Sequence, residues 1–140
     1  MSQSAGSAAV PATNAAREQG ICLLARGGSI EINVQGAGNV AAARAFLPPG
    51  SRIYVSFLSR QSWPETQAAA RAVRAAGFEP VPHVPVRRVS DPGVLERNLE
   101  ALVADAQVRE LLLISGDYAQ AQGPYSSVLQ VMQSALLAKH

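Results

Sequence analysis

Three titratable side chains lie in or just after β-branched runs of the chain, where they could take part in acid–base chemistry. Glu31 lies inside the first such run, His83 lies late in the third, and Asp117 follows the fourth. In parallel α/β folds, functional residues gather at the carboxyl ends of strands, because those ends share one edge of the sheet. The three residues therefore form a candidate site contributed by distant parts of the chain.

Each of these residues also has a purely structural explanation. A glutamate in an edge strand can simply face solvent, and a single histidine in a strand is more often a hydrogen-bonded core or surface residue than a catalyst. The pair Gly116-Asp117 is typical of a turn in which the carboxylate accepts local N–H groups. The joint placement of the three residues is what favours a site.

The elements that must position these residues alternate along the chain. The predicted strands cover residues 29–34, 52–58, 78–86 and 110–114, and the predicted helices cover 15–25, 39–46, 64–76, a stretch that begins at 91, and 124–137. The strands begin near 29, 52, 79 and 110, and the intervals of 23, 27 and 31 residues suit βα units with short loops. Repeated βα units imply parallel strands joined by right-handed crossovers.

Individual residues mark the ends of these elements. We expect Asn39 to cap the helix 39–46, Ser62 or Trp63 to lie at the start of the next helix, and Asp91 to begin the one after that. The helix that begins at Asp91 has apolar side chains at helical spacing on one face, namely Val94, Leu95, Leu99, Leu102 and Val103. Prolines remove three N–H donors from the third strand, which is unusual for a central parallel strand; they are Pro80, Pro82 and Pro85.

The length of 140 residues suits one domain and excludes a complete (β/α)8 barrel, which needs at least ~200 residues. The predicted fold class is α/β, with four consecutive βα units whose parallel strands form half of a (β/α)8 TIM-type barrel. The alternative is a small doubly wound sheet, because periodicity alone does not separate the two. We expect a flexible N-terminal tail over 1–14 and a βα half-barrel domain over 15–140.

Composition excludes several classes of function. Twelve Lys and Arg against ten Asp and Glu give a net charge of +2 with no cluster of bases, so no nucleic-acid partner is expected. The single cysteine, Cys22, excludes an internal disulfide and is expected to pack, and two histidines exclude a histidine metal site, so no metal is expected. The longest apolar runs, such as 111–114, are far too short for a membrane helix, and no secretory signal is found. We therefore expect a soluble, cytoplasmic protein.

Other features allow two interpretations. Arg87 and Arg88 either grip a phosphate or carboxylate or form a solvated pair. Tyr54 either stacks on a planar ligand or packs in the core. The segment Gly36–Gly38 lacks the third glycine of a dinucleotide fingerprint, so we exclude Rossmann-type binding.

Five short segments of the chain form an ordered set, namely Ser29–Glu31, Val55–Leu58, Pro82–His83, Leu113–Asp117 and Gly123–Ser126. In this order and at this spacing, they resemble the first half of the methylenetetrahydrofolate reductase family. The similarity spans roughly Ser29 to the C-terminus and is closest to the short, divergent reductase-like branch of that family.

The resemblance implies a flavoprotein barrel that reduces 5,10-methylenetetrahydrofolate, its folate substrate, to 5-methyltetrahydrofolate in one-carbon metabolism and methionine biosynthesis. It implies FAD as the cofactor and NAD(P)H as the hydride source, with the redox chemistry supplied by the flavin. Glu31 matches the family's acid, whose proton would be retained by desolvation among apolar side chains. Asp117 matches the aspartate between flavin and pterin. His83 matches a flavin-contacting histidine, and Gly116 matches the glycine that lets the backbone approach the flavin.

The chain also departs from the family. Ser115 stands where the family has a cofactor-binding arginine, and Leu58 stands where it has a threonine, which leaves Ser59 as the substitute cofactor contact. Segments for strands five to eight are absent, so we expect this chain to be inactive or incomplete as an enzyme. Self-association or a complementary C-terminal half would cover its open edge. The alternatives are a non-catalytic half-barrel interaction module and an accessory of folate or corrinoid methyl transfer.

Overall fold

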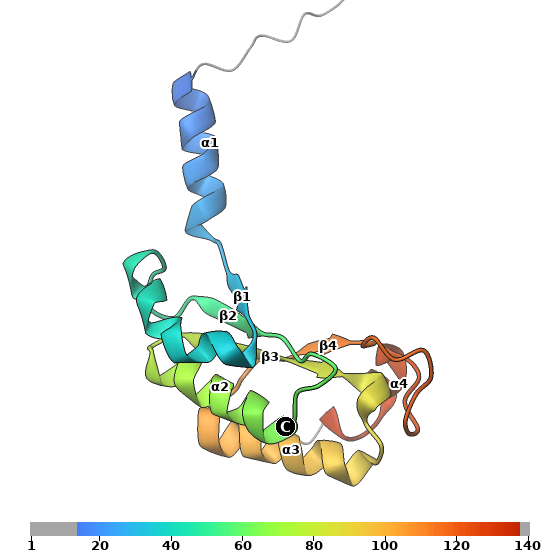
Figure 1. The fold of residues 1–140 in the computed structure, drawn as a ribbon. Coiled ribbons are helices and arrows are strands. Elements are labelled where there is room, and N and C mark those ends of the chain that lie inside the picture. Colours follow the sequence, from blue (N-terminus) through green and yellow to red (C-terminus); the bar gives the residue numbers. More distant parts are fainter. Residues whose placement is uncertain (1–13, 138–140) are drawn as a thin grey trace, which may run out of the picture.

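Helices and strands alternate through residues 14–137, the part of the chain that the computed structural model describes (Figure 1). In chain order the elements are α1 Asn14–Arg26, β1 Ile30–Ile32, the 3-10 helix η1 Val34–Ala45, β2 Arg52–Val55, α2 Trp63–Ala75, β3 Glu79–Pro85, the 3-10 turn η2 Val86–Arg88, α3 Pro92–Ala106, β4 Leu112–Ile114 and α4 Val128–Gln133. The tail expected over 1–14 lies outside the described residues, apart from Asn14.

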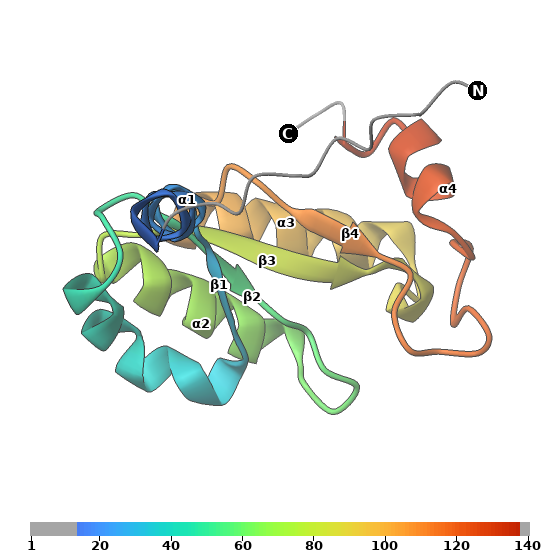
Figure 2. The same ribbon diagram turned by 90° about the horizontal axis from the view of Figure 1, so that it is seen from above.

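The four strands form one sheet in the order β1-β2-β3-β4, and all neighbouring pairs are parallel. The predicted α/β class, with parallel strands and helices between them, is confirmed. β2 pairs with the first half of β3, and β4 pairs with its second half, so β3 is the long central strand (Figure 2). In this register Glu31 lies opposite Tyr54, and His83 lies opposite Leu112.

One face of the sheet is buried against helices. Ile53 of β2 and Val73 of α2 belong to one buried cluster, while Val84 of β3 and Leu95 of α3 belong to another. α2 and α3 run side by side beneath the sheet (Figure 1). Because successive side chains of a strand point to opposite faces, the neighbours of these core residues in sequence point to the other face of the sheet.

The register explains how β3 tolerates three prolines. The N–H of Glu79 donates to the carbonyl of Ser51 at 3.0 Å, so N–H groups at alternate positions from Glu79 onward point toward β2. The missing donors of Pro80 and Pro82 therefore lie on the β4 side, and pairing with β4 begins only at His83. The missing donor of Pro85 lies on the β2 side, where pairing has ended. None of these three prolines therefore removes a ladder hydrogen bond.

The predicted starts of two long helices are confirmed. Ser62 caps α2 in a capping box, in which its N–H donates to Oε2 of Glu65 at 2.8 Å. Asp91 caps α3, and its Oδ1 accepts the N–H of Val94 at 3.1 Å. Both helices combine a capping hydrogen bond with a proline in the first turn, which is why the sequence pattern predicts these two starts well.

Two other helix predictions are wrong in extent. The helix expected over 39–46 with Asn39 as its cap is η1, a 3-10 helix that begins at Val34 and is capped by Asn33, whose Oδ1 accepts the N–H of Gly36 at 2.9 Å. An Asx cap well before the Ala-rich run therefore starts the helix earlier. The helix expected over 124–137 shortens to α4, because bends occupy the chain up to Ser127 and the helix already ends at Gln133.

α1 extends away from the sheet (Figure 1), and its apolar side chains Ile21, Leu23 and Leu24 are exposed. Cys22 is also exposed, so the prediction that it packs is wrong. Within residues 14–137, no helix combines the length and the apolar character that a membrane crossing requires.

Candidate functional site

The sheet face opposite α2 and α3 brings together side chains from β1, β2 and β3. Oε1 of Glu31 lies 4.0 Å from Nδ1 of His83. The ring of Tyr54 packs edge-on against the His83 ring, with 6.1 Å between the ring centroids. Two of the three residues predicted from the sequence are therefore neighbours in space, although 52 positions separate them in the chain. We call Glu31, Tyr54 and His83 the open-face cluster.

His83 is the buried member of this cluster. Its side chain is 10% exposed, and its Nε2 atom is buried without a hydrogen-bond partner among the described residues. Burial lowers the pKa of His83 below 6.5, because the charged imidazolium loses solvation, and the nearby Glu31 charge only partly opposes this. The imidazole is therefore neutral at neutral pH.

Glu31 is in a different environment, since 57% of its side chain is exposed. The acid role implied by the family resemblance needs desolvation by apolar walls, and the described part of the chain provides no such wall over Glu31.

The third predicted residue, Asp117, lies at the carboxyl end of the sheet with two of the predicted cofactor contacts. Ser59, Gly116 and Asp117 line one small cavity of about 20 Å³, together with Arg88 and Tyr118. Pro85 and Ile114 also line it, and they are the register pair two residues beyond His83 and Leu112 on the same face. The cavity, which we call the rim cavity, thus continues the open face toward the strand ends.

Hydrogen bonds to one carbonyl close the rim cavity. The Ser59 carbonyl accepts from Nη1 of Arg88 at 3.1 Å and from the hydroxyl of Tyr118 at 3.3 Å. The Arg88 guanidinium also lies 4.8 Å from the centre of the Phe57 ring. These contacts link the loops that follow β2, β3 and β4.

The two arginines after β3 have a structural role that the sequence analysis did not consider. Arg87 donates from Nε to the Ser126 carbonyl at 3.0 Å and from Nη1 to the Tyr118 carbonyl at 3.1 Å. Arg88 holds the carbonyl of Ser59 in the same way. Both side chains thus donate to backbone carbonyls of neighbouring loops, so the prediction of a pair that contacts only solvent does not hold. Nothing in the local sequence signals this, because the acceptors are distant main-chain atoms.

Gly116 is required by the geometry of the protein itself. Its φ is +83°, which favours glycine, and a Cβ atom there would lie 2.9 Å from Cβ of Pro85. The left-handed backbone and the contact with Pro85 therefore account for the glycine without any ligand. The role that the family resemblance gives this glycine, close approach to a flavin, stays a prediction.

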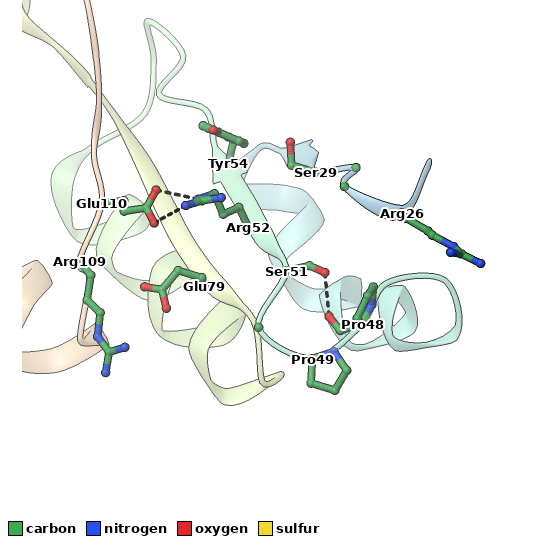
Figure 3. A pocket seen from close by; sticks show the side chains of 13 residues that line it. Arg26, Ser29, Pro48, Pro49, Ser51, Arg52, Tyr54, Glu79, Arg109 and Glu110 are labelled. Carbon is green, nitrogen blue, oxygen red and sulfur yellow. Dashed lines mark hydrogen bonds and ion pairs between the residues drawn. The ribbon is translucent and has the colours of Figure 1, made fainter. Parts of the chain in front are cut away.

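A larger hollow of about 640 Å³ lies at the opposite, amino end of the strands, where the sequence analysis predicted no site (Figure 3). Inside it, Nε and Nη2 of Arg52 donate to the two carboxylate oxygens of Glu110 at 2.7 and 2.9 Å. This pairing raises the pKa of Arg52 and lowers the pKa of Glu110. Figure 3 shows Arg26 and Arg109 extending away from that ion pair. The charges in the middle of the hollow neutralise each other, so we assign no ligand to it.

A metal ion bound by this chain would need several His, Cys, Asp or Glu side chains close together. Among the residues described, no three His, Cys, Asp or Glu side chains gather closely enough to hold a metal ion. No protein-family model matches this chain. The likeness to methylenetetrahydrofolate reductases therefore rests on the five short segments alone.

Proposed function

We propose that this chain is the four-unit half of a (β/α)8-type flavoprotein related to the methylenetetrahydrofolate reductases. In the complete arrangement, FAD would pass a hydride from NAD(P)H to 5,10-methylenetetrahydrofolate. The observation that carries the proposal is the position of the predicted residues. Glu31 and His83 are neighbours on one sheet face, and Ser59, Gly116 and Asp117 share the cavity that continues this face at the carboxyl ends of the strands.

The strand order supports the half-barrel form of this proposal. The order β1-β2-β3-β4 contains no reversal, and α2 and α3 lie on the same face of the sheet. A barrel keeps its helices on the outside and its functional side chains toward the inside and the upper rim. A doubly wound sheet, the alternative arrangement, places helices on both faces and its ligand at a reversal of strand order.

The residues present fit FAD only in part. The exposed carboxylates of Glu31 and Asp117 are polar groups available to a ligand, whereas the unpartnered Nε2 atom of His83 is buried beneath the same face. However, the rim cavity of about 20 Å³ is far smaller than the several hundred Å³ that enclose a cofactor. FAD would have to lie across the carboxyl-end rim of the open face, and we assign no catalytic step to it. We also expect no turnover from these 140 residues alone, because the exposed Glu31 is not shielded from water as a closed active site requires.

Titration of FAD into the purified full-length chain tests the proposal. We expect quenching of flavin fluorescence and retention of the flavin on gel filtration. We expect Asp117→Asn to weaken binding and Glu31→Gln to leave it in place. The matched control is Asp105→Asn, an exposed carboxylate on α3 that pairs with Arg71 away from the rim. Protein that stays colourless, or equal weakening by the Asp117 and Asp105 changes, contradicts the flavoprotein proposal.

A second candidate is a non-catalytic half-barrel interaction module. The small, hydrogen-bonded rim cavity favours it, because three loops are already joined there through the Ser59 carbonyl. Such a module would leave FAD and folate unbound and would use its sheet edges instead. The same flavin titration separates the two candidates, since the module predicts no bound flavin.

A further inference from the structure

The two outer strands of the sheet, β1 and β4, both have an apolar hollow beside them. The hollow beside β1 has a volume of about 440 Å³ and is lined by apolar side chains of β1 and η1, which we call the β1 flank: Ile30, Ile32, Val40, Phe46 and Leu47. The hollow beside β4 has a volume of about 460 Å³ and is lined by apolar side chains around α3 and β4, which we call the β4 flank: Leu99, Leu102, Val103, Val108, Leu111 and Leu137. The two hollows are of almost equal size.

Each flank contains a large apolar side chain left in solvent. Phe46 is 87% exposed on the β1 flank, and Val103 is 47% exposed on the β4 flank. Val103 was predicted to lie on the buried face of its helix, so its exposure is a departure from the amphipathic pattern of α3. Outer strands also present backbone N–H and C=O groups that have no sheet partner on their outer side. Within residues 14–137, both outer strands therefore lack a strand partner on one side and lie next to apolar surface.

A second copy of the same chain supplies a partner for both edges at once. Across a two-fold axis, the β4 edge of one copy meets the β1 edge of the other. We call this β4–β1 contact a seam, and the symmetry creates two identical seams in the dimer. Each seam would join parallel strands and would continue the layer of helices from α3 of one copy to η1 of the other. A foreign partner would have to provide both kinds of edge, which this chain already carries.

We propose that two copies of this chain associate through both flanks and close an eight-stranded parallel barrel. This proposal rests on the half-barrel form of the proposed function, because a curved sheet closes on a second copy whereas a flat sheet continues into a filament. Closure turns the open-face cluster inward, so the second copy provides the cover that Glu31 lacks. The association does not require FAD, and it is therefore tested separately from flavin binding.

Sedimentation equilibrium of the full-length chain without flavin tests the association. The expected result is a concentration-dependent species with twice the mass of 14.6 kDa. Phe46→Glu and Val103→Glu each place a carboxylate in both seams of the assembly. A buried, unpaired carboxylate should weaken each seam at least about tenfold. Because each variant places one carboxylate in each of the two seams, the dissociation constant should rise about a hundredfold or more. Leu24→Glu, on the 82% exposed Leu24 of α1, is the matched control and should leave the dissociation constant unchanged.

Hydrogen exchange on the unaltered chain provides a second test that does not depend on variants. The amides of Ile30–Ile32 and of Leu112–Ile114 should become protected together as the protein concentration rises. Circular dichroism of the two flank variants should match the unaltered chain, since both changed side chains are exposed. A strictly monomeric chain, dissociation by Leu24→Glu alone, protection of one edge strand only, or growth beyond twice the chain mass would each overturn the proposal.

Discussion

Replacement of Gly116 by alanine should destabilise the protein strongly even without any cofactor. A non-glycine residue in the left-handed region costs about 1–2 kcal/mol, and the φ of Gly116 is +83°. The added Cβ would also lie 2.9 Å from Cβ of Pro85, and forced overpacking of this kind costs about 1–3 kcal/mol. The two contributions sum to a loss of about 2–5 kcal/mol in the free energy of unfolding.

Two other glycines separate the contributions of backbone strain and steric overlap. Gly50 has a similar φ of +78°, and a Cβ atom added there would meet no heavy atom within 4 Å, so alanine at Gly50 should cost only the backbone strain. Gly38 has neither a positive φ nor a close neighbour, so alanine there should be neutral or slightly stabilising. The expected order of stability is Gly38→Ala, then Gly50→Ala, then Gly116→Ala.

Urea denaturation followed by circular dichroism measures all three variants on the protein free of flavin. If Gly116→Ala loses no more stability than Gly50→Ala, the close contact with Pro85 does not constrain the turn. In that case, a Gly116→Ala variant that lost only flavin binding would support the family role of this glycine over its structural one. The assay therefore separates the two explanations of the same residue.

Three further predictions concern charge, protonation and packing. Arg74→Met should lower the free energy of urea unfolding by about 2–4 kcal/mol, because it leaves the half-buried carboxylate of Glu79 and the carbonyls of Ala106 and Gln107 without their partner. Arg52→Met removes a similar but exposed ion pair with Glu110 and should cost clearly less. Equal losses in the two variants would refute the argument from burial. NMR titration should place the pKa of His83 below 6.5, and Glu31→Gln should lower that pKa further; an unchanged pKa would contradict the 4.0 Å contact. Since the unfolded chain then binds the proton more readily, the contribution of His83 to stability is complete above pH 6.5 and falls as the pH drops below it. Gly123→Ala should lower the melting temperature sharply in a thermal scan, because its Cβ would clash with the Val89 carbonyl oxygen; a melting temperature equal to that of Gly38→Ala would refute this.

Most of the fold could be predicted from periodicity and helix caps. The apolar run before Ser115, the capping residues Ser62 and Asp91, and the regular spacing of strands all act through local physics that a single sequence displays. The 3-10 character of η1 and the shortness of α4 could not be predicted in this way. Both depend on residues outside the apolar pattern, namely the cap Asn33 before η1 and the bends that end at Ser127 before α4.

The candidate site was predictable only in part. The strand positions of Glu31 and His83 predicted a shared edge, and the register brings them within 4.0 Å of each other. The exposure of Glu31 and the burial of His83 were not predictable, because both side chains point to the same face and differ in that β1 is an outer strand and β3 an inner one. The hydrogen bonds from Arg87 and Arg88 to loop carbonyls were also not predictable, since their acceptors are backbone atoms far away in the sequence.

The central claim is that residues from separate βα units form one flavin-binding face, and NMR spectroscopy of the isotopically labelled chain tests it most directly. On addition of FAD, we predict that the amide signals of Ser59, Gly116 and Asp117 and the ring signals of His83 shift together along one binding curve. Signals of Asp105 on α3 should stay in place. Unchanged spectra, or shifts confined to residues away from the rim and the open face, would contradict the claim.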